Sequence, residues 1–248
     1  MAPVTPEPNQ HPSADFPVCY FADGETLRSR SVSPLVLTGT VDVPVPPARL
    51  LADWQRDISE HLGLEAGDVE CLSLARARTR WPDYRNCVQA MADWTETLGL
   101  PTLLGRSEVA LMACRGARYH HDGLQYGANA FCNLFLSEEQ GLDLHFPAMD
   151  LRIPLARGTT VLFDTCQPHA VIRRGHNSFE ATDFPPGASC DLVFLTWELP
   201  IDDPHLANRL GIRFDFAEAQ TRGEVPQVQV NGVRVEVCPA SGLWRPAD

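Results

Sequence analysis

Residues 130–173 have the sequence AFCNLFLSEEQGLDLHFPAMDLRIPLARGTTVLFDTCQPHAVIR. Short apolar runs in this stretch are separated by turn-forming residues such as Gly141, Pro147 and Gly158, a pattern typical of buried β-strands. Comparable runs lie before and after it. The sequence therefore predicts strands at 108–114, 130–136, 142–146, 151–155, 159–163, 169–173 and 191–199. Short strands at regular spacing predict a mainly β sandwich or barrel, and this number is enough for a jelly roll.

Helices are expected mainly before these strands. In 47–62 apolar residues recur at three- and four-residue spacing, which predicts an amphipathic helix, and a second helix is expected at 82–98. A strand is expected within 33–45. In 227–237, valines alternate around Asn231-Gly232, the pair that favours a type I′ hairpin turn.

We expect one domain over residues 18–248, with its β core at about 107–199 and a C-terminal helix and hairpin at about 203–238. Residues 1–17 are polar and rich in proline, which predicts a disordered tail. The stretch 175–189 is long for a loop, and it is either a lid over a site or a disordered connector.

Charge and composition exclude several classes of partner. The formal net charge of −12 disfavours nucleic acid and anionic membrane surfaces, but a local arginine could still bind a small anion. No apolar run approaches the length that spans a bilayer, and no apolar leader segment is evident. The eight cysteines are spread without close pairs and predict neither a disulfide framework nor a zinc knuckle. We therefore expect a cytoplasmic protein of unknown oligomeric state whose partners are small molecules.

Three residues have the types and spacing of a metal site. His120 and Asp122 are two positions apart, so on a strand both side chains point to the same face. His169, at the start of a later predicted strand, offers a third ligand. Two imidazoles and one carboxylate form the facial triad that binds non-haem iron(II) and leaves positions open for oxygen chemistry.

The order of motifs resembles that of the iron(II)- and 2-oxoglutarate-dependent dioxygenases, in particular their prolyl-hydroxylase-like branch. Besides the three ligands, residues 158–164 (GTTVLFD) followed by His169 resemble the strand before the distal histidine of that family, and 141–147 (GLDLHFP) resemble its central strand. The likeness covers about residues 107–199. It implies a double-stranded β-helix, related to the cupins and buttressed by N-terminal helices. The implied enzyme hydroxylates a small polar or amino-acid-like substrate with dioxygen and releases succinate and CO2.

The resemblance also implies a basic residue that pairs with the distal carboxylate of 2-oxoglutarate. That residue commonly lies at the start of the last strand, but 191–199 contains no basic residue. Arg173 is the favoured substitute because strand parity from His169 places it inward, and Arg174 is the reserve. Asn133 is a further cofactor-binding candidate, since a polar residue in so apolar a strand usually has a partner.

Two other functions stay open. A cupin-like barrel could bind a metal or a sugar without redox turnover, although this chain lacks the His-x-His pair common there. A non-haem iron oxygenase that does not use 2-oxoglutarate is favoured by the missing basic residue. The other histidines, among them His121, His145 and His176, are expected to be structural, with His145 also placed to line the substrate side.

Overall fold

The computed structural model describes residues 16–24, 26–185, 190–216 and 226–247. Most of the expected tail, residues 1–15, and the end of the expected loop, residues 186–189, lie outside this description. Phe16 and Pro17 do not belong to a disordered tail, because both are half-buried and the Pro17 carbonyl oxygen accepts a hydrogen bond from the Val32 amide at 2.9 Å.

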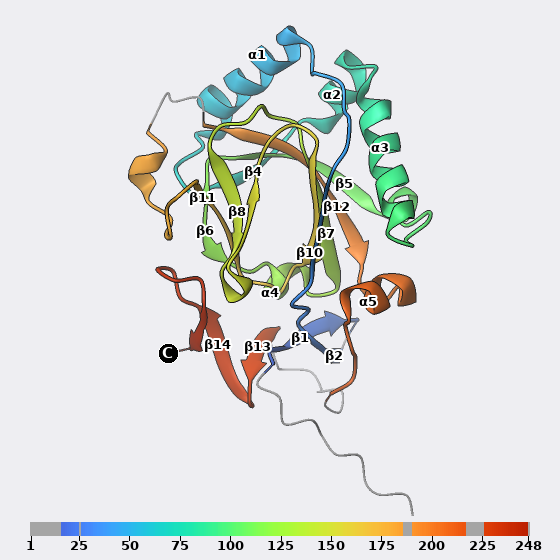
Figure 1. The fold of residues 1–248 in the computed structure, drawn as a ribbon, viewed down its shortest axis with the longest axis vertical. Coiled ribbons are helices and arrows are strands. Elements are labelled where there is room, and N and C mark those ends of the chain that lie inside the picture. Colours follow the sequence, from blue (N-terminus) through green and yellow to red (C-terminus); the bar gives the residue numbers. More distant parts are fainter. Residues whose placement is uncertain (1–15, 25, 186–189, 217–225, 248) are drawn as a thin grey trace, which may run out of the picture.

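The centre of the molecule is a barrel of eight antiparallel strands that face each other in two sheets (Figure 1). Its strands are β5 (Glu108–Cys114), β6 (Ala117–His120), β7 (Asn129–Phe135), β8 (Leu142–Phe146), β9 (Leu151–Pro154), β10 (Thr159–Asp164), β11 (His169–Arg173) and β12 (Leu192–Pro200). The larger sheet has the order β10-β7-β12-β5, and the smaller sheet has the order β6-β11-β8-β9. Because the chain passes back and forth between the two sheets, this is a double-stranded β-helix. The predicted fold class is confirmed.

Two further strands extend the larger sheet at its edges. They are β3 (Val36–Thr40), which pairs with β10, and β4 (Val69–Leu72), which pairs with β5. The strand expected within 33–45 is therefore confirmed as β3, and all seven strands expected between 108 and 199 are found within two residues of their expected ends. The sequence patterns did not predict β4 or β6, which are only four residues long.

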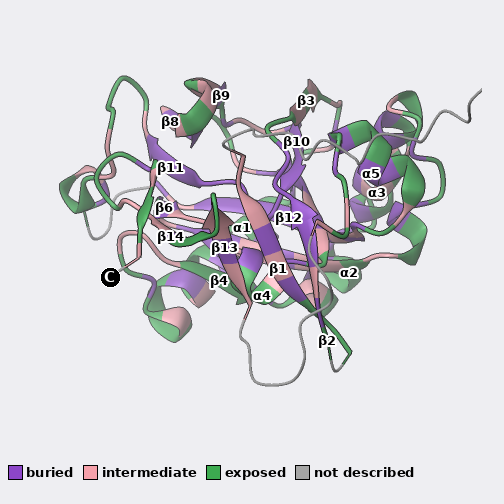
Figure 2. Ribbon diagram, turned by 90° about the horizontal axis from the view of Figure 1, so that it is seen from below, coloured by how far each residue is buried: buried purple, intermediate pink, exposed green. Residues whose placement is uncertain are grey.

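The central strands of the larger sheet are buried on both faces, as the purple β10 and β12 of Figure 2 show. On β10, Val161 and Phe163 belong to the apolar cluster inside the barrel, while Leu162 belongs to the cluster between sheet and helices. Successive side chains of a strand point to opposite faces, so both must be apolar here, and the strand reads as a continuous apolar run.

Three helices cover the outer face of the larger sheet. They are α1 (Ala48–Arg56), which continues as a π-helical turn over Asp57–Leu62, α2 (Leu74–Arg80) and α3 (Tyr84–Thr97). Leu50 and Trp54 of α1 and Met91 of α3 lie in one cluster with Leu195 of β12. The two helices expected at 47–62 and 82–98 are therefore confirmed, and α2 is an addition.

A third sheet joins the two ends of the described chain below the barrel in Figure 1. In the order β15-β14-β13-β1-β2 it contains β15 (Trp244–Pro246), β14 (Val233–Val237), β13 (Gln227–Val230), β1 (Val18–Asp23) and β2 (Thr26–Ser31). The expected hairpin is β13–β14, and positive φ at Asn231 and Gly232 agrees with a type I′ turn. The expected C-terminal helix is α5 (Pro204–Leu210). This sheet matters for the site because β2 supplies Arg30.

The structure contains neither disulfide bonds nor membrane-spanning helices within the described residues. All eight cysteines lie within the described residues, and none is in a disulfide. Among the described residues, no helix is long and apolar enough to cross a membrane.

Candidate metal centre

The two histidines of the site are brought together by strand pairing. β6 and β11 are antiparallel neighbours whose register places His120 directly opposite His169, with ring centroids 4.4 Å apart. Asp122 follows β6 and begins the single-turn helix α4 (Gly123–Tyr126). Its backbone amide donates to the Thr165 carbonyl oxygen at 2.8 Å, which fixes the end of β6 to the turn before β11.

The side chains of His120, Asp122 and His169 converge on one point. Their ligand atoms lie within 4.8 Å of one another. The Asp122 carboxylate oxygens are 3.7 Å from His120 Nε2 and 3.6 Å from His169 Nε2. In the described parts of the chain, no other three His, Cys, Asp or Glu side chains gather in this way. The distances leave room for a cation bonded to all three groups at about 2 Å.

Backbone carbonyls orient both imidazoles. His120 Nδ1 lies 2.6 Å from the Arg118 carbonyl oxygen, and His169 Nδ1 lies 2.9 Å from the Gln167 carbonyl oxygen. Since a carbonyl oxygen only accepts, each Nδ1 carries the proton and donates it, which leaves the Nε2 lone pair directed at the shared point. This is the usual arrangement behind a metal-ligating histidine.

The electrostatics of the three groups also favour a bound cation. Burial lowers the pKa of His169 well below its usual range, so its imidazole stays neutral and able to ligate at physiological pH. Burial raises the pKa of Asp122, because the ionised carboxylate has lost water without gaining a full positive partner. A divalent cation at the centre of the three ligands would supply that partner. Two neutral nitrogens and one carboxylate on one face fit iron(II).

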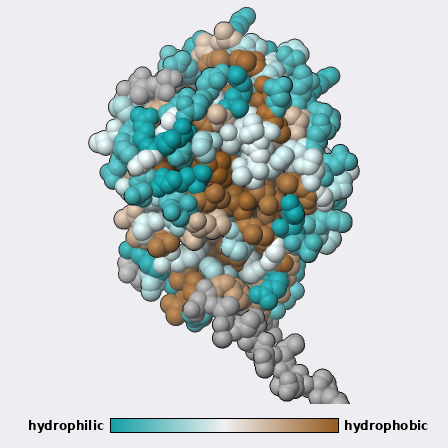
Figure 3. All heavy atoms as spheres, viewed as in Figure 1, coloured by the Kyte–Doolittle hydropathy of each residue, from teal (hydrophilic) through white to brown (hydrophobic). Residues whose placement is uncertain are grey.

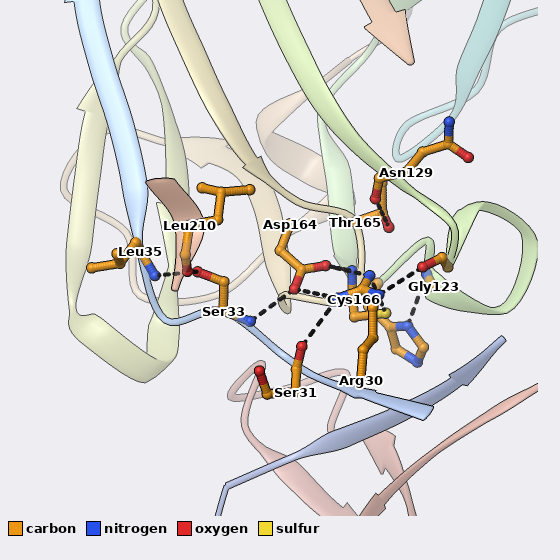
Figure 4. Close-up of polar contacts among 12 residues, drawn as sticks. Arg30, Ser31, Ser33, Leu35, Gly123, Asn129, Asp164, Thr165, Cys166 and Leu210 are labelled. Carbon is orange, nitrogen blue, oxygen red and sulfur yellow. Dashed lines mark hydrogen bonds and ion pairs between the residues drawn. The ribbon is translucent and has the colours of Figure 1, made fainter. Parts of the chain in front are cut away.

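A buried ion pair between Arg30 and Asp164 lies beside the turn that contains Cys166 (Figure 4). Arg30 and Asp164 are both fully buried and make two parallel hydrogen bonds of 2.7 and 2.8 Å. Asp164 also accepts from the backbone amides of Ser33 and Cys166, and Arg30 Nε donates to the Gly127 carbonyl oxygen at 2.7 Å. Arg30 therefore links the turn after Asp164, which leads to His169, with the end of the turn that begins at Asp122.

Thr165 makes a second connection between the same turns. Its hydroxyl lies 2.7 Å from the Tyr126 carbonyl oxygen and 2.8 Å from that of Asn129. With the Asp122 amide bonded to the Thr165 carbonyl oxygen, this residue contacts both ends of the segment that contains α4. The sequence analysis missed Arg30 and Thr165, because a lone arginine in β2 and a threonine in a turn carry no spacing signal.

The two turns approach so closely that Gly123 has no room for a side chain. A Cβ at this position would overlap the sulfur of Cys166 and lie 3.1 Å from its Cα. We expect Gly123→Ala to destabilise the protein by about 1–3 kcal/mol, the usual result of overpacking, and to weaken metal binding. Urea unfolding and iron titration measure the two effects. Gly105→Ala is the matched control, since a Cβ there meets nothing within 4 Å; equal results for both variants would contradict the prediction.

A cavity of about 310 Å³ opens from the three ligands into the barrel. Its wall is formed by Val69, Cys71, Ala110, Met112, Cys114, Ala117, His120, Asp122, Gln125, Tyr126, Phe131, Asn133, Phe135, Leu144, Phe163, His169, Val171, Phe194, Thr196 and Glu198. Most of these side chains are apolar, and the space-filling view of Figure 3 shows apolar surface at the centre of the face that lies over the barrel. The cavity has the size of a site for one small organic molecule.

Of the three predicted cofactor-binding residues, only one lines the cavity. Asn133 lies in the wall of the cavity. Arg173 and Arg174 do not: Arg173 donates to the Gln140 carbonyl oxygen at 3.2 Å, and Arg174 pairs with Asp143 and Glu139 at 2.8 Å each. Although strand parity puts Arg173 on the same face as His169, the cavity wall on β11 ends at Val171.

His121, His145 and His176 lie outside the candidate ligand set, as expected. His121 packs against Trp244 and accepts from the Gly123 amide at 3.1 Å, and burial lowers its pKa to about 4. His145 was expected to line the substrate side, but it is not part of the cavity wall. Its Nδ1 is hydrogen-bonded to the Tyr119 hydroxyl at 2.6 Å. His176 pairs with Asp183 at 2.7 Å.

The described part of the expected lid, 175–185, does not contribute to the cavity wall. Phe184 in this segment is buried and stacks on Phe179, with ring centroids 5.3 Å apart. It packs so closely on Gly116 that a Cβ there would overlap its ring. In the described conformation, residues 175–185 therefore form a loop that is packed against the barrel and does not cover the cavity.

The fold is similar to that of several solved structures. No protein-family model and no curated protein matches the chain. A prolyl-4-hydroxylase from Pseudomonas putida is 17% identical, with a TM-score of 0.40 over 66% of this chain and 92% of that one. The collagen prolyl hydroxylase of Paramecium bursaria Chlorella virus-1 is 8% identical, with a TM-score of 0.39 over 66% and 89%. The epimerase SnoN from nogalamycin biosynthesis, solved with Fe3+ and alpha ketoglutarate, is 11% identical, with a TM-score of 0.38 over 76% and 81%.

Proposed function

We propose that this protein is a mononuclear iron(II)-dependent oxygenase. The observation that carries the proposal is the convergence of two imidazoles and one carboxylate within 4.8 Å at the mouth of an apolar cavity. Three protein ligands leave half of an octahedral iron site for other molecules. Bound iron would supply activation of dioxygen, and the cavity would hold an organic molecule beside it.

Each residue of the site has a defined task in this proposal. His120 and His169 bind the metal through Nε2, and the carbonyls behind their Nδ1 atoms keep the proton away from the bonding nitrogen. Asp122 supplies the single negative charge, so the loaded site keeps a net positive charge that attracts a further anionic ligand. Apolar side chains such as Phe163, which packs on the His169 ring with centroids 4.9 Å apart, keep water from the site.

The order of sequence motifs supports a 2-oxo acid as co-substrate and hydroxylation of a small polar or amino-acid-like substrate as the reaction. In that chemistry one oxygen atom of dioxygen enters the substrate, and the other enters the shortened acid left after loss of CO2. The oxo acid used by the resembled family is 2-oxoglutarate, whose distal carboxylate needs a cationic partner. The described wall of the cavity offers no lysine or arginine, so 2-oxoglutarate does not fit this part of the site.

Metal binding is the first test of the proposed function. We expect the metal-free protein, titrated with iron(II) under nitrogen and followed by equilibrium dialysis, to bind one ion per chain. Asp122→Asn should weaken that binding strongly, because it removes the only charge among the ligands. Equal binding by the Asp122→Asn variant would contradict the assignment of this site.

Oxygen consumption then separates an oxygenase from a barrel without redox turnover. The iron-loaded protein would be supplied with several 2-oxo acids and a panel of amino acids and short peptides while dissolved oxygen is recorded. We expect consumption that depends on both an oxo acid and a substrate. Tight iron binding without any consumption across the panel would favour a cupin-like metal-binding barrel instead.

A further inference from the structure

Two polar side chains inside the cavity lack a hydrogen-bond partner. Asn133 of β7 is 7% exposed and Thr196 of β12 is 8% exposed, and both line the cavity. Neither Asn133 Oδ1 nor Thr196 Oγ1 has a partner within the described residues. Strand register places these two residues directly opposite each other. Buried polar atoms are almost always paired, so two unpaired atoms on facing residues of a cavity wall indicate a place where polar groups of a ligand would bind.

Strand register also shows how far Asn133 and Thr196 lie from the candidate metal ligands along the barrel. Phe131, two residues before Asn133 on β7, packs on Phe163, which in turn packs on His169. Phe131 is therefore level with the metal ligands, and Asn133 lies about 7 Å further along the strand. Beyond it, Phe135 and Phe194 pack together with centroids 5.2 Å apart in the wall of the cavity. A molecule bound at the metal would reach Asn133 and Thr196 with its far end.

No positive charge faces this inner part of the cavity. Besides the metal ligands, the only ionisable carboxylate in the wall is Glu198, and no lysine or arginine is present in the described wall. Arg174 is held by two acidic partners, and Arg173 is bonded to a backbone carbonyl beyond the wall. An anionic group beside Asn133 would thus be buried among apolar side chains without a counter-ion.

From these observations we infer that Asn133 and Thr196 form a subsite for an uncharged hydrogen-bonding group, so that the 2-oxo acid bound by this protein ends in a neutral group such as a primary amide. The inference rests on the proposed function and specifies its co-substrate. It excludes 2-oxoglutarate as the preferred oxo acid and assigns Thr196 a binding role that the sequence patterns did not predict.

The donors and acceptors of the subsite match an amide better than a carboxylate. The Asn133 amide has a donor and an acceptor end, and the Thr196 hydroxyl can act as either. A primary amide uses both kinds of group, whereas a carboxylate accepts only and leaves the Asn133 oxygen without a donor. A carboxylate that leaves water for an apolar wall also loses most of its hydration without a compensating ion pair.

Two isosteric ligands make the test direct. 2-Oxoglutarate and 2-oxoglutaramate differ only in a distal carboxylate or a distal amide. Each would be titrated into the iron-loaded protein under nitrogen by isothermal titration calorimetry, with visible absorption as a second readout of binding at the metal. We expect 2-oxoglutaramate to bind on the order of 100-fold more tightly, because only the carboxylate is buried without a partner.

Substitutions at the subsite should change this preference. Thr196→Lys adds a cation at the inner end and should favour 2-oxoglutarate over the amide, while Leu124→Lys adds the same charge on an exposed residue of α4 and should leave the preference unchanged. Thr196→Val removes the hydroxyl with little change of shape. It should weaken 2-oxoglutaramate binding about tenfold, the effect of one lost hydrogen bond, and it keeps the test decisive if the lysine variant does not fold.

The outcomes separate failure of this inference from failure of the proposed function. Tighter binding of 2-oxoglutarate that is lost in Arg173→Gln would overturn the inference and assign the carboxylate to Arg173, while the oxygenase proposal would stand. Equal binding of the two acids, or binding of neither by an iron-loaded protein, would also overturn the inference. A protein that binds no iron would instead refute the proposed function.

Discussion

Replacement of His169 by alanine is expected to lower the affinity for iron(II) by more than about 100-fold and to abolish any oxygen consumption that depends on a 2-oxo acid. The loss of a partner behind a ligand already reduces metal affinity by about 10–100-fold, and the loss of a ligand itself should exceed that. His169 is also the ligand most shielded from water, so no solvent molecule easily takes its place. Equilibrium dialysis with iron(II) under nitrogen measures the effect.

A surface histidine provides the control for this experiment. His205 is exposed on α5, outside the cavity wall, and His205→Ala should bind iron like the unchanged protein. Circular dichroism should show that His169→Ala keeps its fold, because an alanine at the start of β11 removes one ring and no backbone hydrogen bond. Near-normal iron affinity in a folded His169→Ala variant would show that the metal binds elsewhere.

Replacement of Arg30 by methionine should destabilise the protein by about 3–5 kcal/mol, which corresponds to a fall of roughly 6–20 °C in the unfolding temperature of a chain of this size. The reason is that Asp164 would keep its charge in a fully buried position without its cation. Because the pair joins the turn that precedes His169 to the end of the turn that begins at Asp122, we also expect iron affinity to fall by about 10–100-fold. Thermal unfolding and iron titration of the same samples measure both effects.

Arg28 gives a matched control on the same strand. It forms ion pairs with Asp23 and Asp215 at 3.4 Å at the surface, where such pairs contribute about 1 kcal/mol or less. Arg28→Met should therefore change stability little and leave iron binding intact. The double variant Arg30→Met/Asp164→Leu should regain part of the lost stability, since it removes the uncompensated charge. A loss no larger for Arg30→Met than for Arg28→Met would contradict the structural role of the buried pair.

The local patterns of the sequence predicted most of the barrel, and the failures have a common physical cause. Strand β10 carries apolar residues on both faces, and β8 alternates apolar residues with Asp143 and His145; both strands are bounded by turn residues, so their composition alone marks them. The four-residue strands β4 and β6 are too short for a period-two signal, and the charged helix α2, with three arginines, lacks an apolar stripe of sufficient length. Their conformations depend on neighbours that pair with or cover them.

The three candidate metal ligands show which part of a site can be predicted from sequence. The spacing of His120 and Asp122 was enough to predict that both could reach one ion, although β6 ends at His120 and Asp122 lies in the turn after it and not on the strand. Local spacing does not reveal how the third candidate ligand, His169, is positioned, or which residues hold the turn before it in place. Arg30 is 134 positions from Asp164 along the chain, and nothing in either local sequence indicates their pairing.

The sequence by itself therefore determined most of the strand pattern, the fold class and the three candidate ligands, because these follow from side-chain alternation and from residue spacing. Only the tertiary structure decided that His169 faces His120, that Asn133 faces Thr196 and that Arg173 lies beyond the cavity wall. Strand parity fixes the face on which a side chain lies. How far along the barrel it lies depends on the register with strands that are distant in sequence, and that register is set by packing of the whole core.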